Sequence, residues 1–465
     1  MQDKTFRILP FLLICCLTFI DVQAQNNTKS PYSRFGMGEI AFQGLSMQTG
    51  MGQSGSAFRR SSYLNPLNPA SYNSLNRTVY ETAALFERGT ITSNGQTQLF
   101  RNASYGYLAF GLPIMKKIGW GASFGLQPVS HVGYNISNYL FTGSDSLLTQ
   151  TSYTGRGGLS KFYIGHSFKL WSCNCFDSLE KPFVKHELHG GFNINYIYGQ
   201  MRLSKAAYFG DTTFTTNNYK EDRTRYLGDV TFDLGLQYVL RPDETHSLVV
   251  GATYSPTRIL TGHQVVFART VYPGYYDHDR DTLLYAETAN QPALKMPASW
   301  GLGMVYQVQG IGKDANDKKK QNELILALDI KGQNWSKYTM FGLKDSLQNS
   351  FSVSAGAAFT PLTDLNAKKH RLGKIEYRAG LRYAKTNLQL NGQQLAEYGV
   401  SAGAGIPLRI FKARDNNSLY YSKMNLSIEY FKRGAFNGSL LQENHLRFTL
   451  GITFEDEWFQ KWKID

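Results

Sequence analysis

The stretch YLGDVTFDLGLQYVL, residues 226–240, alternates apolar and polar side chains along most of its length. Asp229, Asp233 and Gln237 fall on one side of the alternation. The other side carries Tyr226, Val230, Phe232, Leu234, Leu236, Tyr238 and Leu240. Because successive side chains point to opposite faces in a β-strand, this stretch predicts a strand with one apolar and one polar face.

The same period-two alternation recurs from Arg77 to Phe454 and predicts an all-β fold. In LRFTLGITF, residues 446–454, the apolar side chains share one face, while Arg447 and Thr449 share the other. We predict fourteen antiparallel strands, at residues 77–92, 97–112, 117–138, 150–171, 184–204, 222–240, 245–267, 284–308, 322–336, 350–361, 371–386, 393–407, 419–433 and 441–454.

Strand length separates a soluble β-sandwich from a transmembrane β-barrel. A membrane-spanning strand needs about 9–11 residues, whereas strands of globular proteins cluster at about 5–6. Most of the predicted runs are of the longer kind, and aromatic residues such as Phe192, Tyr196 and Tyr198 recur toward strand ends, which fits interfacial girdles. Residues 77–454 are therefore expected to form a transmembrane barrel, followed by an interfacial tail at 455–465.

The first 24 residues have the pattern of a cleaved secretory signal. Lys4 and Arg7 precede an apolar run from Ile8 to Ile20, and small residues lead to a cut before Gln25. The run is too short for a spanning helix, which needs about 20 residues. An exported barrel of this kind is expected in the outer membrane of a Gram-negative cell, in contact with membrane lipid and with both termini in the periplasm.

Residues 25–76 precede the barrel and do not alternate. Within them, SSYLNPLNPASYNSL, residues 61–75, contains two Asn-Pro pairs, Asn65-Pro66 and Asn68-Pro69. Each proline lacks a backbone donor and restricts the residue before it, so this segment cannot form a regular helix or an inner strand. Either the segment folds into the lumen as a plug, which we favour, or it is a disordered leader.

The sequence resembles the FadL-type outer-membrane transporters of long-chain fatty acids and other hydrophobic compounds. The resemblance rests on the signal, the Gly-rich N-terminal segment, the Asn68-Pro69-Ala70 motif in LNPASY, fourteen strands, and KMPASWGLGMVY at residues 295–306. The opening SPYSRFGMGE and the closing LGITFEDEWFQKWKID are more similar to a divergent branch, which also includes the type IX secretion barrel. The chain departs from many barrels in ending with Asp465 rather than with an aromatic residue.

The resemblance implies a kinked third strand that opens the wall sideways. Pro128 lies within the predicted third strand, and the neighbouring strand carries Gly155, Gly157 and Gly158 in TGRGGLSKFY. Proline cannot donate a hydrogen bond to the ladder and marks an edge or a bulge. These four residues are candidates for a lateral gate, and the alternative is an ordinary bulge near the barrel rim.

Other chemistry finds little support in the sequence. In HELH, His186 and His189 are three residues apart on a predicted strand, so they face opposite ways and do not form a metalloprotease motif. DHDRD, residues 277–281, lacks the glycine and the final glutamate of a calcium loop. Cys173 and Cys175 could form a strained disulfide, bind a metal or remain thiols. We expect no catalytic residue, cofactor, metal site or nucleic-acid partner.

The leading functional hypothesis is passive uptake of hydrophobic small molecules such as long-chain fatty acids, past a luminal plug and with a possible sideways exit. The alternative is a barrel that docks or shuttles exported proteins. A general porin comes third, and an outer-membrane lipase or protease comes last because no residues support it.

Overall fold

The computed structural model describes residues 28–456 except for 94, 143–146, 177–181, 210–216, 244, 273–278, 311–321, 346, 362–370, 413–418 and 435–439. The predicted signal at residues 1–24 and most of the predicted tail, from residue 457 onward, therefore lie outside the described residues. The side chain of Cys175 also lies outside them.

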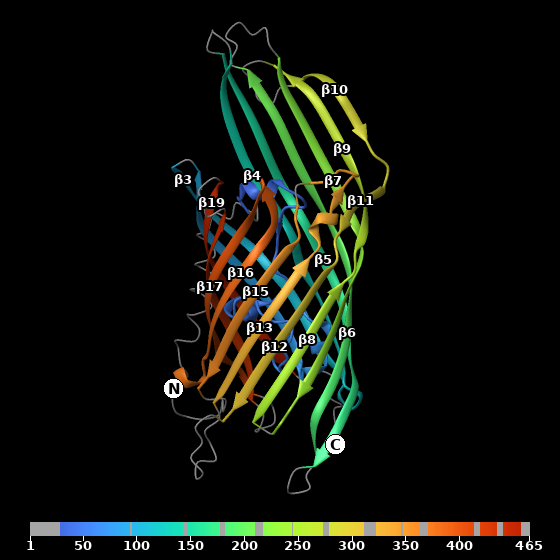
Figure 1. Ribbon diagram of the computed structural model, residues 1–465, viewed down its shortest axis with the longest axis vertical. Coiled ribbons are helices and arrows are strands. Elements are labelled where there is room, and N and C mark those ends of the chain that lie inside the picture. The colour runs from blue at the N-terminus through green and yellow to red at the C-terminus, as the bar shows by residue number, and fades with distance from the viewer. Residues whose placement is uncertain are drawn as a thin grey trace.

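The strands form one closed antiparallel barrel (Figure 1). The last strand pairs with the first along a continuous ladder from Gln442–Thr92 to Asp456–Thr78. Fourteen strands surround the lumen, which confirms the predicted fold class and number. They are β2 (Thr78–Ser93), β3 (Gln96–Met115), β4 (Trp120–Thr142), β5 (Leu147–Phe176), β6 (Pro182–Phe209), β7 (Asn218–Leu240), β8 (His246–Ser255) continued by β9 (Arg258–Val271), β10 (Asp279–Glu287) continued by β11 (Gln291–Met296) and β12 (Ser299–Gln309), β13 (Glu323–Gln333), β15 (Ser350–Thr360), β16 (Glu376–Leu390), β17 (Gln393–Lys412), β18 (Leu419–Gly434) and β19 (Gln442–Asp456).

The wall alternates as the sequence predicts. Ile428 is 39% exposed on the outside, whereas its neighbour Glu429 is 1% exposed in the lumen. The apolar residues exposed on the outer surface include Ile194, Tyr196, Leu234, Leu236, Val250, Leu302, Met304, Leu326, Leu328, Leu381, Val400 and Phe448. An apolar outer surface on a barrel that is closed by the ladder between β19 and β2 is suited to lipid. Among the described residues, no helix is long and apolar enough to cross a membrane.

We call the end at which β2 begins and β19 ends the base, and the opposite end the mouth. The strands near β5 and β6 rise well above the rest at the mouth (Figure 1). These two strands have 30 and 28 residues, whereas β13 and β15 have 11 each. The connection between β13 and β15 contains the 3-10 helix η4 (Trp335–Lys337) and the short strand β14 (Thr339–Met340), which pairs with β11.

Residues 28–76, which we call the plug, run through the lumen from the mouth to the base (Figure 1). The plug contains η1 (Pro31–Arg34), β1 (Glu39–Ile40), α2 (Ser46–Gly50) and η2 (Pro69–Ser74). At the mouth, Ser30 Oγ donates to Glu443 on β19 at 2.5 Å. Farther down, Ser46 Oγ donates to Glu81 on β2 at 2.7 Å. At the base, Tyr72 donates to Asn193 on β6 at 2.9 Å.

Candidate functional site

Glycines on the inner face of the wall make room for the plug backbone. A Cβ at Gly121 would lie 2.5 Å from the carbonyl oxygen of Tyr72, and one at Gly191 would lie 2.5 Å from the carbonyl carbon of Pro69. Further inward glycines whose Cβ would overlap plug atoms are Gly235, Gly251, Gly356 and Gly380. Glycine is required where two backbones approach this closely, so the wall and the plug are shaped to each other.

The Asn-Pro segment lies buried at the base of the lumen. Asn65 donates from its amide to the carbonyls of Gly55 at 2.7 Å and Phe58 at 2.8 Å. Asn68 donates to the carbonyl of Ser56 at 2.6 Å, and its side-chain oxygen accepts from the backbone of Ala70 at 3.1 Å. The two asparagines therefore satisfy backbone groups that an irregular segment would otherwise leave unpaired.

The two prolines stand beside these asparagines and have different surroundings. Pro69 is the first residue of η2, a position at which its missing N–H is not needed. Pro66 lines the main cavity between the plug and the wall. Ala70 is fully buried. The five residues of the sequence motif thus shape the plug, and Pro66 alone reaches space that a ligand could fill.

Asp329 on β13 holds one turn of the plug. Its Oδ2 atom accepts from the backbone nitrogens of Gly55 at 2.7 Å and Ser56 at 2.8 Å, and from Ser56 Oγ at 2.9 Å. Lys331 Nζ lies 3.3 Å from the same oxygen. Hydrogen bonds to a buried carboxylate are stronger than neutral ones, so this aspartate is a firm attachment point between wall and plug.

Arg60 provides a second attachment from the plug to the wall. Its guanidinium pairs with Glu376 at 2.6 Å and also with Glu323. Glu376 in turn pairs with Arg378 at 2.7 Å. Burial opposes the charge on the Arg60 guanidinium, but Glu376 and Glu323 outweigh it and hold its pKa above the usual range. Losing one partner would leave another charge buried without compensation, which is costly.

The strand β1 anchors the upper plug through Glu39. Its carboxylate pairs with Arg433 on β18 at 2.9 Å and accepts from Thr28 at 2.6 Å. Burial alone would raise the pKa of Glu39, but Arg433, His445 and Arg447 hold it well below its usual range. The carboxylate therefore remains ionised, and the ion pair persists at acidic pH.

A cavity of about 480 Å³ lies between the plug and the wall on the mouth side. Its lining includes Met37, Phe42, Leu67, Val129 and Ile197, together with Lys161. The volume is in the range of small-molecule pockets, and the lining combines these apolar side chains with many polar and charged ones, such as Asp233, Arg382 and Arg433. The cavity could hold a hydrophobic molecule.

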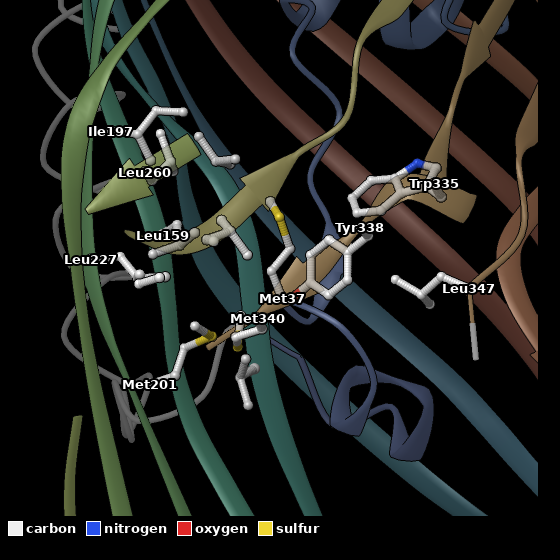
Figure 2. Packing of buried hydrophobic residues seen from close by; sticks show 14 of the residues in the cluster. Met37, Leu159, Ile197, Met201, Leu227, Leu260, Trp335, Tyr338, Met340 and Leu347 are labelled. Carbon is white, nitrogen blue, oxygen red and sulfur yellow. The ribbon is translucent and has the colours of Figure 1, made fainter. Parts of the chain in front are cut away.

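A cluster of apolar side chains borders this cavity toward the mouth. Figure 2 shows Met37 of the plug beside Tyr338, with Trp335 next to it and Leu159 and Ile197 on the wall. Trp335 and Tyr338 come from the connection between β13 and β15, and both are buried. This connection therefore covers the apolar interior on the mouth side.

Lys161 on β5 is a cation that lines this cavity and is largely buried. It is 9% exposed, and no hydrogen-bond or ion-pair partner is found for its amino group in the part of the chain that the structure describes. The carboxylate that acts on it is Asp233 on β7, which already accepts from Asn195 at 3.0 Å and Ser255 at 2.7 Å. A buried ammonium without its own partner favours an anionic group in the ligand.

The wall is interrupted between β3 and β4. Their ladder begins at the base and ends with the pair Leu108–Leu126, although both strands continue toward the mouth. A register shift places Gly106 in a bulge of β3 against β2. A second bulge lies between Pro128 and Ser130 of β4, against β5. The two strands diverge where these bulges occur, because a bulge bends its strand.

The plug fills part of the resulting gap. Glu39 and Ile40 of β1 pair with His131 and Ser130 of β4, on the edge that β3 has left. A smaller cavity of about 70 Å³ remains between β1 and β3, and Pro128 is among its lining residues. Ile40 borders both cavities, so β1 separates the main cavity from the gap.

The predicted gate residues lie on two neighbouring strands, Pro128 on β4 and the three glycines on β5. Pro128 lies where pairing with β3 has ended. The glycines of β5 keep their partners, with Gly155 opposite Tyr134, Gly157 opposite Val132 and Gly158 opposite His131. The gap thus arises on the β3 side of Pro128, while the ladder toward the glycines continues past the bulge.

Sequence reasoning missed Lys161, Gly106 and the strand β1. The position of Lys161 was readable, since its strand neighbours Phe162 and Ile164 alternate with it and face outward. The role of β1 could not be predicted from the sequence, because its two residues lie within an irregular segment and gain strand geometry only by pairing with β4. No group of His, Cys, Asp and Glu able to hold a metal occurs within the described ranges.

Comparison with solved structures finds FadL-type barrels. A FadL homologue of Pseudomonas aeruginosa matches with a TM-score of 0.50 and 13% identity, over 90% of this chain and 99% of the other. The toluene transporter TodX of Pseudomonas putida matches with a TM-score of 0.49 and 14% identity, over 90% and 99%. The toluene transporter TbuX of Ralstonia pickettii gives 0.48 and 12%, over 89% and 99%.

At this identity the likeness to the FadL homologue shows the fold, which agrees with the expected FadL-like barrel. Comparison with curated proteins found no match. A family model named BamG matches residues 6–465, which include the plug and every strand of the barrel. The chain belongs to the BamG family.

Proposed function

We propose that this protein is an outer-membrane channel for the passive uptake of hydrophobic small molecules, with long-chain fatty acids as the leading class. The observation that carries the proposal is the cavity of about 480 Å³, which β1 separates from a gap in the wall. The driving force for capture is burial of apolar ligand surface, at about 25 cal/mol per Å².

The route follows from the order of these features. With the mouth outside the cell, a ligand enters the main cavity beneath the connection that carries Trp335. A shift of β1, which is held to β4 by a short ladder at Glu39 and Ile40, joins the main cavity to the gap between β3 and β4. The ligand then leaves sideways toward lipid, and the tightly bound base of the plug stays in place.

The test of uptake is accumulation of a labelled fatty acid by whole cells. Cells with the wild-type protein should accumulate the label faster than cells in which its gene is deleted. Equal accumulation by the two strains would contradict the proposal.

Replacing Lys161 with methionine is expected to weaken binding of a fatty acid roughly tenfold, because the ligand carboxylate loses its buried charge partner. Methionine keeps a similar length without the charge. Binding of a fluorescent fatty acid to the purified protein would measure the effect, and the methyl ester of the same acid is the control. If acid and ester lose affinity equally, Lys161 shapes the cavity and does not recognise the anion.

Replacing Pro128 with valine is expected to slow uptake and leave binding in the cavity unchanged. Valine supplies the N–H that proline lacks and favours regular strand geometry, so the gap beside β3 should narrow. Uptake rate and ligand affinity are to be measured on the same variant. An unchanged uptake rate would count against a sideways exit at this gap.

Docking of exported proteins is the second candidate, favoured by the tall wall at the mouth. This wall carries exposed apolar residues on β10, including Leu283 at 57% and Tyr285 at 62%. Such residues are more typical of a protein contact than of a free aqueous surface. Purification in mild detergent should then retain a protein partner, and a variant with Leu283 and Tyr285 changed to serine should lose it.

A further inference from the structure

Four arginines lie in one row across the interrupted part of the wall. Arg88 of β2 pairs directly with Arg101 of β3 in the strand register. Arg156 of β5 pairs directly with Arg202 of β6. The row is therefore made of two arginine pairs, one on each side of the gap between β3 and β4.

The strand register places the two arginine pairs at the same height along the barrel. The last pair of the β3–β4 ladder is Leu108–Leu126, and Arg101 is as many residues from Leu108 on β3 as Gly133 is from Leu126 on β4. Gly133 is the strand partner of Arg156. Because Gly133 has no side chain, nothing on β4 separates Arg156 from the gap at this level.

All four side chains point to the outside of the barrel. Glu87 and Asn102, the neighbours of Arg88 and Arg101, line the small cavity inside the wall. The neighbour of Arg202 is Met201, which is buried in the inner apolar cluster. Side chains alternate along a strand, so the arginines face outward, and all four are exposed.

Like charges directly opposite each other on neighbouring strands are destabilising. No carboxylate lies within ion-pair distance of any of the four guanidiniums among the residues that the structure describes. Elsewhere near the mouth arginines are paired, as Arg223 is with Glu221 at 2.9 Å and Arg269 with Asp222 at 2.9 Å. The row therefore lacks the compensation that the surrounding surface has.

The row stands just above the aromatic border of the apolar outer surface. Tyr196 and Tyr198 stack at 5.9 Å on β6, directly below the level of Arg202. Tyr105, 53% exposed, lies below Arg101 on β3. Aromatic girdles flank the apolar band of a membrane barrel at each interface, so these tyrosines at the upper border of the band place the arginines at the headgroup layer.

We propose that the arginine row, Arg88, Arg101, Arg156 and Arg202, binds the phosphate groups of an outer-leaflet glycolipid. Guanidinium groups bind phosphate in a bidentate manner, and two adjacent guanidiniums suit one phosphate better than a single one. The two pairs fit a headgroup with two phosphates, one on each side of the gap. The bound lipid lies across the upper part of the gap and closes the wall where strand pairing is missing.

The test uses the full-length protein purified in detergent, with a bisphosphorylated lipid A as the probe. Retention of the lipid is measured by native mass spectrometry. We expect R88Q/R101Q and R156Q/R202Q each to lower the affinity roughly tenfold or more, since each removes two charges at the headgroup level. The matched control K337Q/K344Q removes two exposed charges at the mouth, away from the row, and should bind as the wild type does.

Two further probes separate the possible anions. Lipid A without phosphates should bind weakly to every form of the protein, and inorganic phosphate should compete with intact lipid A only at high concentration. Equal retention of lipid A by the wild type and both double variants would overturn the proposal. It would also be overturned if the double variants kept the lipid but lost a co-purifying acidic protein.

This inference is independent of the proposed uptake, because the row is on the outside and Lys161 is inside. A loss of lipid A binding with unchanged fatty-acid binding would support the row alone. Loss of fatty-acid binding in K161M with unchanged lipid A binding would support the cavity alone.

Discussion

Replacing Asp329 with alanine is expected to convert a closed barrel into one that conducts ions. The carboxylate accepts three hydrogen bonds from Gly55 and Ser56 of the plug. Their loss leaves two buried backbone donors without an acceptor, at about 1–3 kcal/mol each. It also leaves Lys331 without the carboxylate beside it. The turn at Gly55 should leave the wall, and the lumen should admit water and ions.

Single-channel recording in planar bilayers measures this change. The control is Asp243, which accepts hydrogen bonds from Thr245 and His246 on an exposed turn. D243A should conduct no ions, like the wild type. D329N should give a smaller conductance than D329A, because its side-chain oxygen can still accept hydrogen bonds from the plug. If D329A is silent too, the plug is held in place without this carboxylate.

Replacing Gly380 with valine is expected to prevent the plug from packing against the wall in its normal position. A Cβ at Gly380 would overlap the backbone of Met51 and Gly52, and Gly356, opposite it in the ladder, is equally close to Met51. Gly380 lies on β16, the strand that also carries Glu376 and Arg378, so a displacement of this strand would disturb the ion pairs of Arg60 as well. Overpacking a filled interior typically costs about 1–3 kcal/mol, and more where backbone is involved.

The readout for G380V is cleavage by trypsin after Arg59 and Arg60, which lie inside the folded barrel. The variant should be cut there while its barrel still shows heat-dependent migration on a gel. G228V is the control, because the atom nearest to a Cβ at Gly228 would be the side-chain hydroxyl of Tyr196 at 3.2 Å, and no backbone atom would be closer than 3.9 Å. Full protection of G380V would mean that the plug tolerates the extra side chain.

The fold was predictable because the side chains of a membrane-spanning strand alternate between the lipid and the lumen, and this alternation is visible in the sequence of each strand. The predicted strand at 222–240 corresponds to β7 (Asn218–Leu240), and the strand at 419–433 corresponds to β18 (Leu419–Gly434). Strand ends were predicted less accurately, both at the mouth, where β6 continues to Phe209 beyond the predicted end at 204, and at the base, where β17 continues to Lys412 beyond the predicted end at 407. Outside the lipid-facing part of a strand, no apolar alternation marks where the strand ends.

The interruptions of single strands were harder to predict. The prediction gave one strand at 284–308, but the structure has β10, β11 and β12 in succession. Pro292 accompanies a register shift within β11, and Pro297 separates β11 from β12. These prolines are visible in the sequence, yet whether proline ends a strand or bends it depends on the neighbours with which the strand pairs.

The site could be predicted only in outline. The Asn-Pro segment indicated irregular, buried backbone, and Pro128 indicated an interruption of the third strand. The contacts of Asn68 with β7 and β8, and of β1 with β4, join residues far apart in the sequence. Such contacts depend on the closed geometry of the barrel and not on any local pattern, so no reading of single segments contains them.

The contacts at the two joining strands have a consequence for biogenesis. The ring is completed where β2 meets β19, and the N-terminal segment touches both partners there, through Ser46 to Glu81 and through Ser30 to Glu443. The segment that fills the lumen thus adds contacts to both joining strands beyond their own ladder. We expect the N-terminal residues to take part in closing the ring, so that the union of the first and last strands is a late event of assembly.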